Sequence, residues 1–362
     1  MGLRKSPLEE LVILPSAFRG KRVWLSGHTG FKGGWLAVWL ADMGARVTGF
    51  SLAPRTPFFS QLKLKNRLRH ELGDLRDAAK VRKSIVRSRP DFVLHLAAQP
   101  LVRDSYLRPL ETYEVNTLGT AHVLEALREV RHPCAAVFIT TDKVYRNEER
   151  RHAFREEDPL GGQDPYSASK AATEILISSY RDSFFQRHPV RIASARSGNV
   201  IGGGDYAKNR IVPDAFRALR SGRAISVRNP KSIRPWQHVL EPTSGYLALA
   251  VHLSRDRKIG GAYNFGPSPR DQKTVAALVR EILKKWPGRW ERLREENPPH
   301  EAGRLQLNNR KAWQDLKWKP RLSFAHSVGM TMDWYHASTR PGFDAYRACQ
   351  EQIQEYSKSR NP

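Results

Sequence analysis

Residues 22–35 have the sequence Arg-Val-Trp-Leu-Ser-Gly-His-Thr-Gly-Phe-Lys-Gly-Gly-Trp, and this stretch decides the fold class. The apolar run Arg22–Ser26 ends at a glycine, and apolar residues then recur at helical spacing over Lys32–Met43. Glycines at a strand-to-helix turn let the backbone approach a pyrophosphate, and the helix N-terminus supplies free N–H donors. The stretch predicts a dinucleotide-binding turn; the alternative is a glycine-rich turn that holds no ligand.

Strand and helix patterns alternate downstream of this turn. We expect strands at 46–52, 92–96, 135–140 and 191–196, and long helices at 113–130 and 166–185. Such alternation implies parallel strands joined by right-handed crossovers. The predicted fold is therefore α/β, a doubly wound parallel (Rossmann) sheet.

The alternation of strand and helix patterns changes after Asn199, where Gly202-Gly203-Gly204 and several prolines interrupt it. Short strands at 225–227 and 262–265 and helices at 213–219 and 275–285 predict a smaller α/β C-terminal lobe for substrate. We assign residues 18–198 to the dinucleotide-binding domain, with segments near 236–265 returning to it. Residues 199–340 form mainly the substrate lobe, and 341–362 a polar tail that frays.

The composition excludes several classes of protein. Hydrophobic residues make up 40% of the 362 residues, which suits a globular chain, and no apolar run is long enough to cross a membrane. The first 20 residues lack the features of a signal peptide, and the two cysteines form no framework, so we expect a cytoplasmic protein without a metal site.

The net charge of +25 allows two interpretations. One is an anionic partner; the other is a basic bias dispersed over a solvated surface. Lys and Arg are scattered and no nucleic-acid-binding signature occurs, so we favour the second interpretation and expect no nucleic acid partner.

Two motifs indicate proton-transfer chemistry. Tyr166 and Lys170 are four residues apart at the start of a predicted helix, hence on one face, where a cationic lysine lowers the pKa of a phenol. Thr141, Asp142 and Lys143 follow a buried strand, at the edge where doubly wound sheets bind ligands. The alternatives are a surface pair and an ordinary turn or N-cap.

The choice between NAD and NADP stays open. The carboxylate that usually binds the adenosine ribose is absent, and Ser51 stands at that strand end with Arg55 nearby. Ser51 suits a ribose hydroxyl, which favours NAD, and Arg55 would suit a 2′-phosphate. Asp74 is a candidate for contact with adenine or for a helix N-cap.

These pieces together resemble the extended short-chain dehydrogenase/reductase family. The matching segments are Gly27–Gly33, His95–Gln99, Asn116–Thr120, Thr141-Asp142, Tyr166 with Lys170, and Gly198–Val200. Within the family, Lys143 after Thr141-Asp142 and the segment Ile233–Val239 resemble the CDP-glucose branch of the sugar-nucleotide 4,6-dehydratases. The dTDP-glucose branch has glutamate where this chain has Lys143.

The resemblance implies a lyase that dehydrates an NDP-hexose, foremost CDP-glucose, by internal hydride transfer through NAD. Tyr166 would take the C4 hydroxyl proton with Lys170 beside it, Thr141 would orient the C4 oxygen, and Asp142 would be the acid at C6. Lys143 is an uncertain candidate for the C5 base. Implied cofactor contacts are Gly27, Thr29, Gly30, Phe31, Gly33, Ser51, Asp74, Leu75, Leu96, Ala97, Ala98, Asn116, Tyr166 and Lys170. Implied substrate contacts are Gln99, Thr141, Asn199, Arg210, Arg234, His238 and Arg304.

The resemblance also implies a homodimer, or a dimer of dimers, formed by the helices at 113–130 and 166–185, and a role in deoxysugar and polysaccharide (O-antigen) biosynthesis. One rival is a 4-epimerase of the same fold, against which the Asp142-Lys143 pair argues. The other is a non-catalytic dinucleotide-binding regulator, against which Thr141, Tyr166 and Lys170 argue together.

Overall fold

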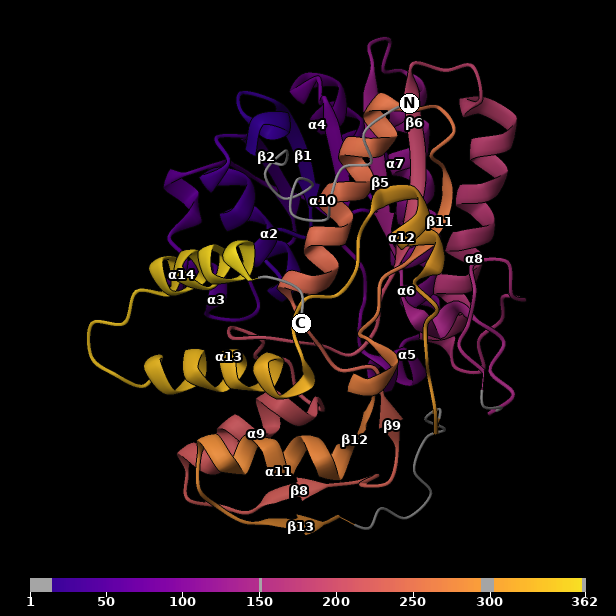
Figure 1. Cartoon of the computed structure of the whole chain (residues 1–362). Coiled ribbons are helices and arrows are strands. Elements are labelled where there is room, and N and C mark those ends of the chain that lie inside the picture. The colour runs from indigo at the N-terminus through magenta and orange to yellow at the C-terminus, as the bar shows by residue number, and fades with distance from the viewer. Residues whose placement is uncertain (1–14, 150–151, 294–302, 360–362) are drawn as a thin grey trace, which may run out of the picture.

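The computed structural model describes residues 15–149, 152–293 and 303–359 (Figure 1). A seven-stranded parallel sheet in the order β11-β6-β5-β4-β1-β2-β3 forms its centre. The strands are β1 (Arg22–Ser26), β2 (Arg46–Ser51), β3 (Arg69–Leu72), β4 (Phe92–His95), β5 (Cys134–Ile139), β6 (Val190–Arg196) and β11 (Gly261–Asn264). The predicted doubly wound α/β fold is confirmed.

Helices cover both faces of this sheet. On one side lie α2 (Phe31–Asp42), α10 (Leu240–Arg255) and α14 (Ala345–Lys358); on the other lie α4 (Ala78–Ser88), α7 (Gly119–Arg128) and α8 (Pro165–Tyr180). Alternate residues of β1 enter the two cores, Val23 and Leu25 on the α2 side and Trp24 on the α4 side. This period of two explains why the strand is apolar throughout.

Shorter helical pieces connect these layers. They are α3 (Phe58–Gln61), η1 (Leu64–Asn66), α5 (Val102–Leu107), α6 (Pro109–Tyr113), η2 (Glu114–Leu118), η3 (Asp142–Val144), η4 (Arg181–Phe185) and α12 (Arg310–Leu316). Both long predicted helices are present but interrupted: η2 is a π-helical turn between α6 and α7, and η4 is one at the end of α8.

The later part of the chain builds a separate layer, which lies below the sheet in Figure 1. It contains β7 (Val200–Ile201), α9 (Ile211–Arg220), β8 (Ile225–Val227), β9 (Ile233–Arg234), β10 (Gln237–His238), η5 (Pro269–Asp271), β12 (Lys273–Thr274), α11 (Val275–Lys285), β13 (Trp290–Arg292) and α13 (Phe324–Ala337). Its strands form three two-stranded sheets. The strand near 262–265, within the segments expected to return to the dinucleotide-binding domain, joins the central sheet as β11, beside β6.

The expected polar tail from residue 341 is wrong for most of its length, and only its last three residues lie outside the described residues. Residues 345–358 form α14, and its Tyr346, Cys349, Ile353 and Tyr356 are buried. The Tyr356 hydroxyl donates to Glu241 Oε2 at 2.9 Å and lies 2.9 Å from Ser244 Oγ, both on α10. The buried face of the amphipathic helix α14 therefore packs in the helical layer that contains α10, on one face of the sheet.

Candidate active site

The glycine-rich turn lies where the strand order reverses, between β1 and β4. Gly27 has φ of 76°, and a Cβ there would lie 2.8 Å from the Ala97 nitrogen. A side chain on Gly33 would overlap the Gly27 carbonyl. Gly30 caps α2 without any side-chain hydrogen bond to the first-turn N–H groups. The turn thus presents backbone donors to a diphosphate, and its residues fit a dinucleotide.

The β1 and β4 ends are tied together beside this turn. Ser26 Oγ accepts hydrogen bonds from the backbone N–H groups of Leu96 and Ala97, both at 3.0 Å, and contacts the ring of buried His95 at 2.7 Å. Ser26 therefore fixes the position of Leu96, Ala97 and the following Ala98, which line the candidate cofactor site.

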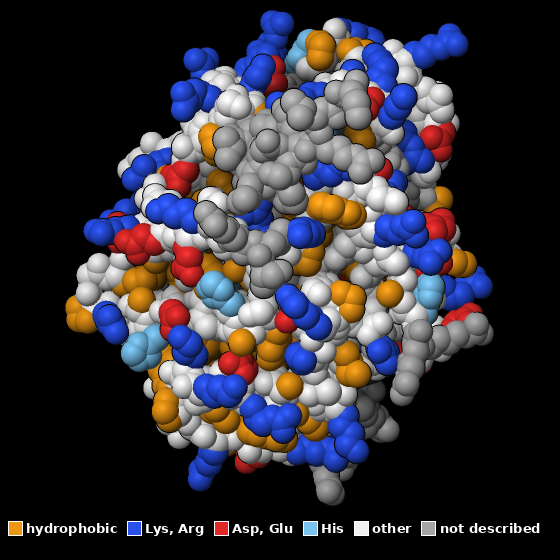
Figure 2. Space-filling view, in the orientation of Figure 1, with side chains coloured by type: hydrophobic (Ala, Val, Ile, Leu, Met, Phe, Trp, Pro, Cys, Tyr) orange, Lys and Arg blue, Asp and Glu red, His pale blue; other side chains and the backbone are white. Residues whose placement is uncertain are grey.

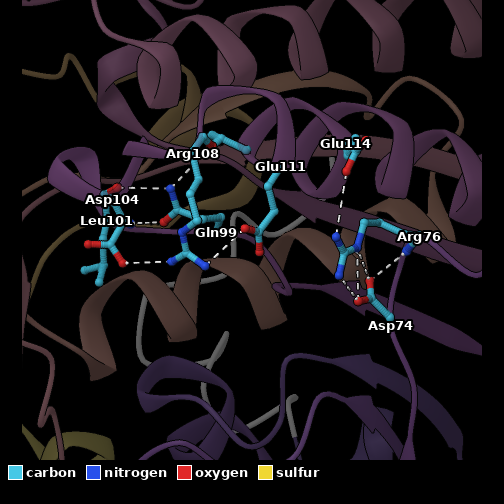
Figure 3. Close-up of polar contacts among 9 residues, drawn as sticks. Asp74, Arg76, Gln99, Leu101, Asp104, Arg108, Glu111 and Glu114 are labelled. Atoms are coloured by element: carbon cyan, nitrogen blue, oxygen red, sulfur yellow. Dashed lines mark hydrogen bonds and ion pairs between the residues drawn. The ribbon is translucent and has the colours of Figure 1, made fainter. Parts of the chain in front are cut away.

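At the end of β2, the hydroxyls of Thr29 and Ser51 lie 2.7 Å apart, and both side chains are buried. No carboxylate occupies this strand end. Asp74 follows β3 and accepts hydrogen bonds from the Arg76 backbone and guanidinium (Figure 3). Asp77, not Asp74, caps α4 by accepting from Lys80 N, so the N-cap interpretation of Asp74 is wrong.

Asn116, in the π-helical turn η2, links the β4 loop to α8. Its Oδ1 accepts from Gln99 N at 2.8 Å, and its Nδ2 donates to Ser169 Oγ at 2.9 Å. The Gln99 side chain bonds to Leu101 in its own loop (Figure 3) and donates to Thr112 Oγ1 in α6. These bonds hold the Gln99 side chain, and its contact with substrate stays a prediction.

The segment after β5 carries the predicted catalytic carboxyl. Thr141 Oγ1 donates to Asp142 Oδ1 at 3.1 Å, while Asp142 Oδ2 is buried with no hydrogen-bond partner in the described part of the chain. Burial raises the pKa of Asp142, although Lys143, Thr141 and Arg234 act in the opposite direction. The Asp142 carboxyl is thereby biased toward its protonated, proton-donating form.

Tyr166 and Lys170 reach this segment from the first turns of α8. Burial raises the pKa of Tyr166 to about 12, against the stabilising effects of its hydrogen bond with Thr141 and of the Arg210 charge. Burial lowers the pKa of Lys170 to about 8, and its amine donates to the Ile139 carbonyl at 3.3 Å. The expectation that Lys170 brings the Tyr166 pKa below its ordinary value is wrong, because burial outweighs the nearby cations.

Two predicted substrate arginines border the catalytic group. Arg210 Nη1 pairs with Asp205 at 3.0 Å, and its charge acts on Tyr166. Arg234 is buried, donates to the Ile233 and Gly303 carbonyls, and acts on Asp142. Arg304 pairs with Ile233 through an isolated β-bridge, so it lies next to Arg234.

Asn199 adopts a left-handed backbone conformation, φ 47°, just before β7. His238 is not brought to the site surface: its side chain has no exposed area and packs edge-on to Trp35 with ring centroids 5.7 Å apart. Burial lowers its pKa to about 3. The expected contact of His238 with a diphosphate is therefore wrong, and the ring belongs to the core.

Lys32 is a site residue to which the sequence assigned no role. Its amine lies 5.9 Å from the centroid of the Tyr246 ring, and burial with the charges of Lys170 and Arg210 lowers its pKa to about 7. Its place inside the glycine-rich stretch was the available signal, but spacing alone does not show that its side chain turns toward Asp142 and Lys170.

Comparisons with known proteins agree with this geometry. The sequence profile of the GDP-mannose 4,6 dehydratase family matches residues 25–331. CDP-glucose 4,6-dehydratase of Salmonella typhimurium is 45% identical over 94% of this chain and 97% of its own length. The structure of epimerase Mth375 from Methanothermobacter thermautotrophicus superposes with a TM-score of 0.79 at 23% identity, covering 96% and 98% of the two chains. The dTDP-glucose 4,6-dehydratase DesIV of Streptomyces venezuelae, with NAD and TYD bound, gives 0.74 at 22% identity, covering 87% and 97%.

Proposed function

Since this chain belongs to the GDP-mannose 4,6 dehydratase family, we propose that it converts CDP-D-glucose to CDP-4-dehydro-6-deoxy-D-glucose as an NAD-dependent hydro-lyase. The observation that carries the proposal is the contact of Thr141 with both Asp142 and Tyr166. That contact brings a buried carboxyl acid and a phenol to the same side chain. The identity of 45% to a relative that acts on CDP-glucose supports this nucleotide.

NAD, when bound, supplies the group that takes hydride from sugar C4 and returns it to C6. We assign the proton transfers to residues of the protein. Tyr166 accepts the C4 hydroxyl proton, with Thr141 hydrogen-bonded to hold the oxygen, and the Arg210 charge stabilises the phenolate. We also assign Lys170 to hold the nicotinamide ribose.

Water loss needs a base at C5 and an acid at C6. Asp142 donates its proton to the leaving C6 hydroxyl, which departs as water. Lys143, half-buried beside it, is our candidate to remove the C5 proton and to give one back when hydride returns to C6. An amine serves as a base only in its neutral form, so Lys143 requires desolvation by the bound sugar.

We assign the cofactor to the turn between β1 and α2 and to the ends of β2, β3 and β4. Ser51 and Thr29 present hydroxyls to the adenosine ribose and favour NAD over NADP, and Asp74 and Leu75 lie toward adenine. Arg210, Arg234 and Arg304, with Asn199, are our candidates for the CDP diphosphate, because guanidinium groups bind phosphate oxygens in pairs.

Nucleotide preference tests the function directly. The purified protein is incubated with CDP-glucose, dTDP-glucose, UDP-glucose and GDP-mannose, and the 4-keto product is followed by its absorbance in alkali. We expect fastest turnover of CDP-glucose with no net consumption of NAD. Faster turnover of another nucleotide sugar would contradict the CDP assignment, and a denatured sample that releases mainly NADP would contradict the cofactor.

We further propose a homodimer formed by α6–α7 and α8 of two subunits, action in the cytoplasm, and a place in deoxysugar and polysaccharide biosynthesis. Exposed apolar residues on these helices, among them Leu110 and Ile175, support the interface. Among the described residues, no helix has both the length and the apolar character needed to cross a bilayer. We retain 18–198 and 199–340 as the cofactor and substrate parts of the chain.

A further inference from the structure

A buried carboxylate lies directly below the catalytic group. Glu174, on α8 one helical turn after Lys170, has 4% of its surface exposed. Its Oε1 accepts from Thr140 Oγ1 at 2.5 Å, and its Oε2 accepts from Ser194 Oγ and Arg196 Nη2, both at 2.8 Å. One side chain thus joins α8 to the ends of β5 and β6.

Arg196, its ionic partner, extends this connection to two further segments. Its Nη1 donates to the Tyr145 hydroxyl at 2.8 Å and to the Glu156 carbonyl at 3.1 Å. The Tyr145 hydroxyl in turn donates to Asn264 Oδ1, on β11, at 2.7 Å. The ion pair therefore lies at the centre of a network across β5, β6 and β11.

Stability alone does not account for an ion pair in this position. Removing two charges from water costs several kcal/mol per ion, and well-packed apolar residues of similar volume often serve as well or better. The pKa of Glu174 is nevertheless held below its ordinary value, because Arg196, Thr140 and Ser194 together outweigh the effect of burial. The carboxylate is therefore charged, and its charge lies beside the catalytic lysine.

We propose that Glu174 is a positioning residue for the reaction, which locks the β5 end that carries Thr141 and Asp142 to the helix that carries Tyr166 and Lys170, and keeps Lys170 in its cationic form. This inference rests on the proposed dehydratase function. Thr140, held by Glu174, is adjacent to Thr141, and Ile139, which accepts the Lys170 hydrogen bond, precedes it. Lys170 and Glu174, the two α8 side chains that hold the end of β5, therefore lie one helical turn apart.

The charges around Lys170 explain why an anion is needed there. Lys32 on α2 is a second amine at the site, and burial and the Lys170 charge lower its pKa to about 7. His95 on β4 is neutral at ordinary pH, because burial and Lys170 lower its pKa to about 3. Arg196 on β6 adds a further cation. Glu174 is the group that acts against burial at Lys170 and raises its pKa toward the ordinary value.

Glu174→Gln tests the inference, because it keeps the shape and removes the charge. The readout is the pH dependence of the first hydride transfer in a single turnover with CDP-glucose, followed by nicotinamide absorbance. We expect the alkaline limb of the rate profile to move down by about one pH unit, which means about a tenfold slower step on that limb, with the apparent KM little changed. Lowering the pH should restore part of the lost rate.

Two matched variants separate charge from packing. Ser194→Ala removes one hydrogen bond to the Glu174 carboxylate but keeps the charge of that carboxylate. The alkaline limb of the rate profile should therefore stay at the wild-type pH. Glu174→Asp keeps the charge on a shorter stem, so the rate should fall through the lost contact with Thr140 while the limb again stays. An effect of Glu174 on packing alone would instead lower the rate equally at all pH values.

A second measurement does not need turnover. Competitive acetylation by acetic anhydride across pH, read on the peptide containing residue 170, gives the titration midpoint of the Lys170 amine in the intact protein. We expect a lower midpoint in Glu174→Gln, or in Glu174→Gln plus Arg196→Gln, which leaves no unpaired buried cation, if the single Gln variant does not fold. An unchanged midpoint in a folded variant overturns the inference. A wild-type protein that dehydrates none of the nucleotide sugars would instead refute the proposed function, and acetylation would still decide the role of Glu174.

Discussion

At the scale of single residues, the three groups that we propose to transfer protons lie in different environments. Asp142 is buried and biased toward its acid form, Tyr166 is held by Thr141 and faces Arg210, and Lys143 is half-buried beside them. Burial raises the pKa of both Asp142 and Tyr166, so their different hydrogen-bond partners and neighbouring charges distinguish their proposed roles.

Tyr166→Phe should stop the reaction at its first step. The variant lacks the oxygen that accepts the C4 hydroxyl proton but fills nearly the same volume, so binding should persist. We expect no transient reduced nicotinamide in a single turnover with CDP-glucose. Appearance of that absorbance at the wild-type rate would remove Tyr166 from the first step.

Asp142→Asn should divide the reaction in two. The amide keeps the size of the carboxyl but donates no proton to the C6 oxygen, so C4 oxidation should proceed while water loss stalls. Reduced nicotinamide should accumulate, and overall turnover should fall by roughly a hundred- to ten-thousand-fold, the usual worth of general acid catalysis.

Lys143→Met tests the C5 base separately. If Lys143 removes the C5 proton, the variant should also accumulate reduced nicotinamide and should lose exchange of solvent deuterium into C5. Persistent exchange with near-normal turnover would assign the proton removal to another residue.

Much of the candidate site can be predicted from the sequence, because its candidate catalytic residues lie close to one another along the chain. Tyr166 and Lys170 are one helical turn apart, and Thr141-Asp142 directly follows a strand, so local pattern places them. His238 was not placed correctly, since the direction of its side chain depends on a distant partner. For His238 that partner is Trp35 of α2, about two hundred residues earlier in the chain.

At the scale of elements, the strand and helix alternation was predictable because parallel strands are buried on both faces and appear as apolar runs. The C-terminal helix α14 was not, since its buried residues are spread among charged ones over 14 residues. Their spacing at 346, 349, 353 and 356 is helical, and this was the available signal. Only the structure shows the α10 groups that α14 docks on.

Glu241 on α10 makes this docking sensitive to pH. Burial raises its pKa from 4.5 to about 7, although Leu322 N, Arg321 N and Tyr356 donate to it. The folded protein therefore holds a proton on Glu241 that the unfolded chain releases near its ordinary pKa. The associated stability is full below about pH 4 and is lost as the pH rises through about 7.

Glu241→Gln should remove this dependence. The free energy of unfolding of wild type, minus that of the variant, should fall by roughly 3 kcal/mol between pH 4 and pH 8. Urea titrations at several pH values measure it. Glu351→Gln, an exposed change on α14, is the control and should show no such slope. A wild-type and variant difference that is flat with pH would contradict the assignment.

At the scale of the whole molecule, the charge of +25 is dispersed. Figure 2 shows Lys and Arg side chains over the whole visible face, with acidic and apolar side chains between them. The apolar exposure is less even: Leu107 is 81%, Leu110 71% and Ile175 61% exposed, all on or beside the helices of the proposed subunit interface. The scatter of Lys and Arg along the sequence predicts the first distribution, whereas the second depends on which helix faces stay uncovered.

Leu110→Asp with Ile175→Asp should therefore weaken self-association. We expect light scattering to give the mass of two chains for wild type at micromolar concentration and of one chain for the double variant. Val86→Asp, at an exposed apolar position on α4, is the control and should remain a dimer. A wild-type protein of single-chain mass would refute the dimer itself.

The position of β11 at the edge of the central sheet has a consequence for biosynthesis. Strand β6 is complete at Arg196, but its neighbour ends at Asn264, about 70 residues later. At about 5–20 residues per second, a ribosome needs roughly 4 to 14 s to produce that stretch. For that interval the nascent chain presents β6 as an unpaired edge, the kind of surface that recruits other strands. The growing polypeptide is then at its greatest risk of aggregation, and chaperone binding should be strongest in ribosome-bound chains that end between these two strands.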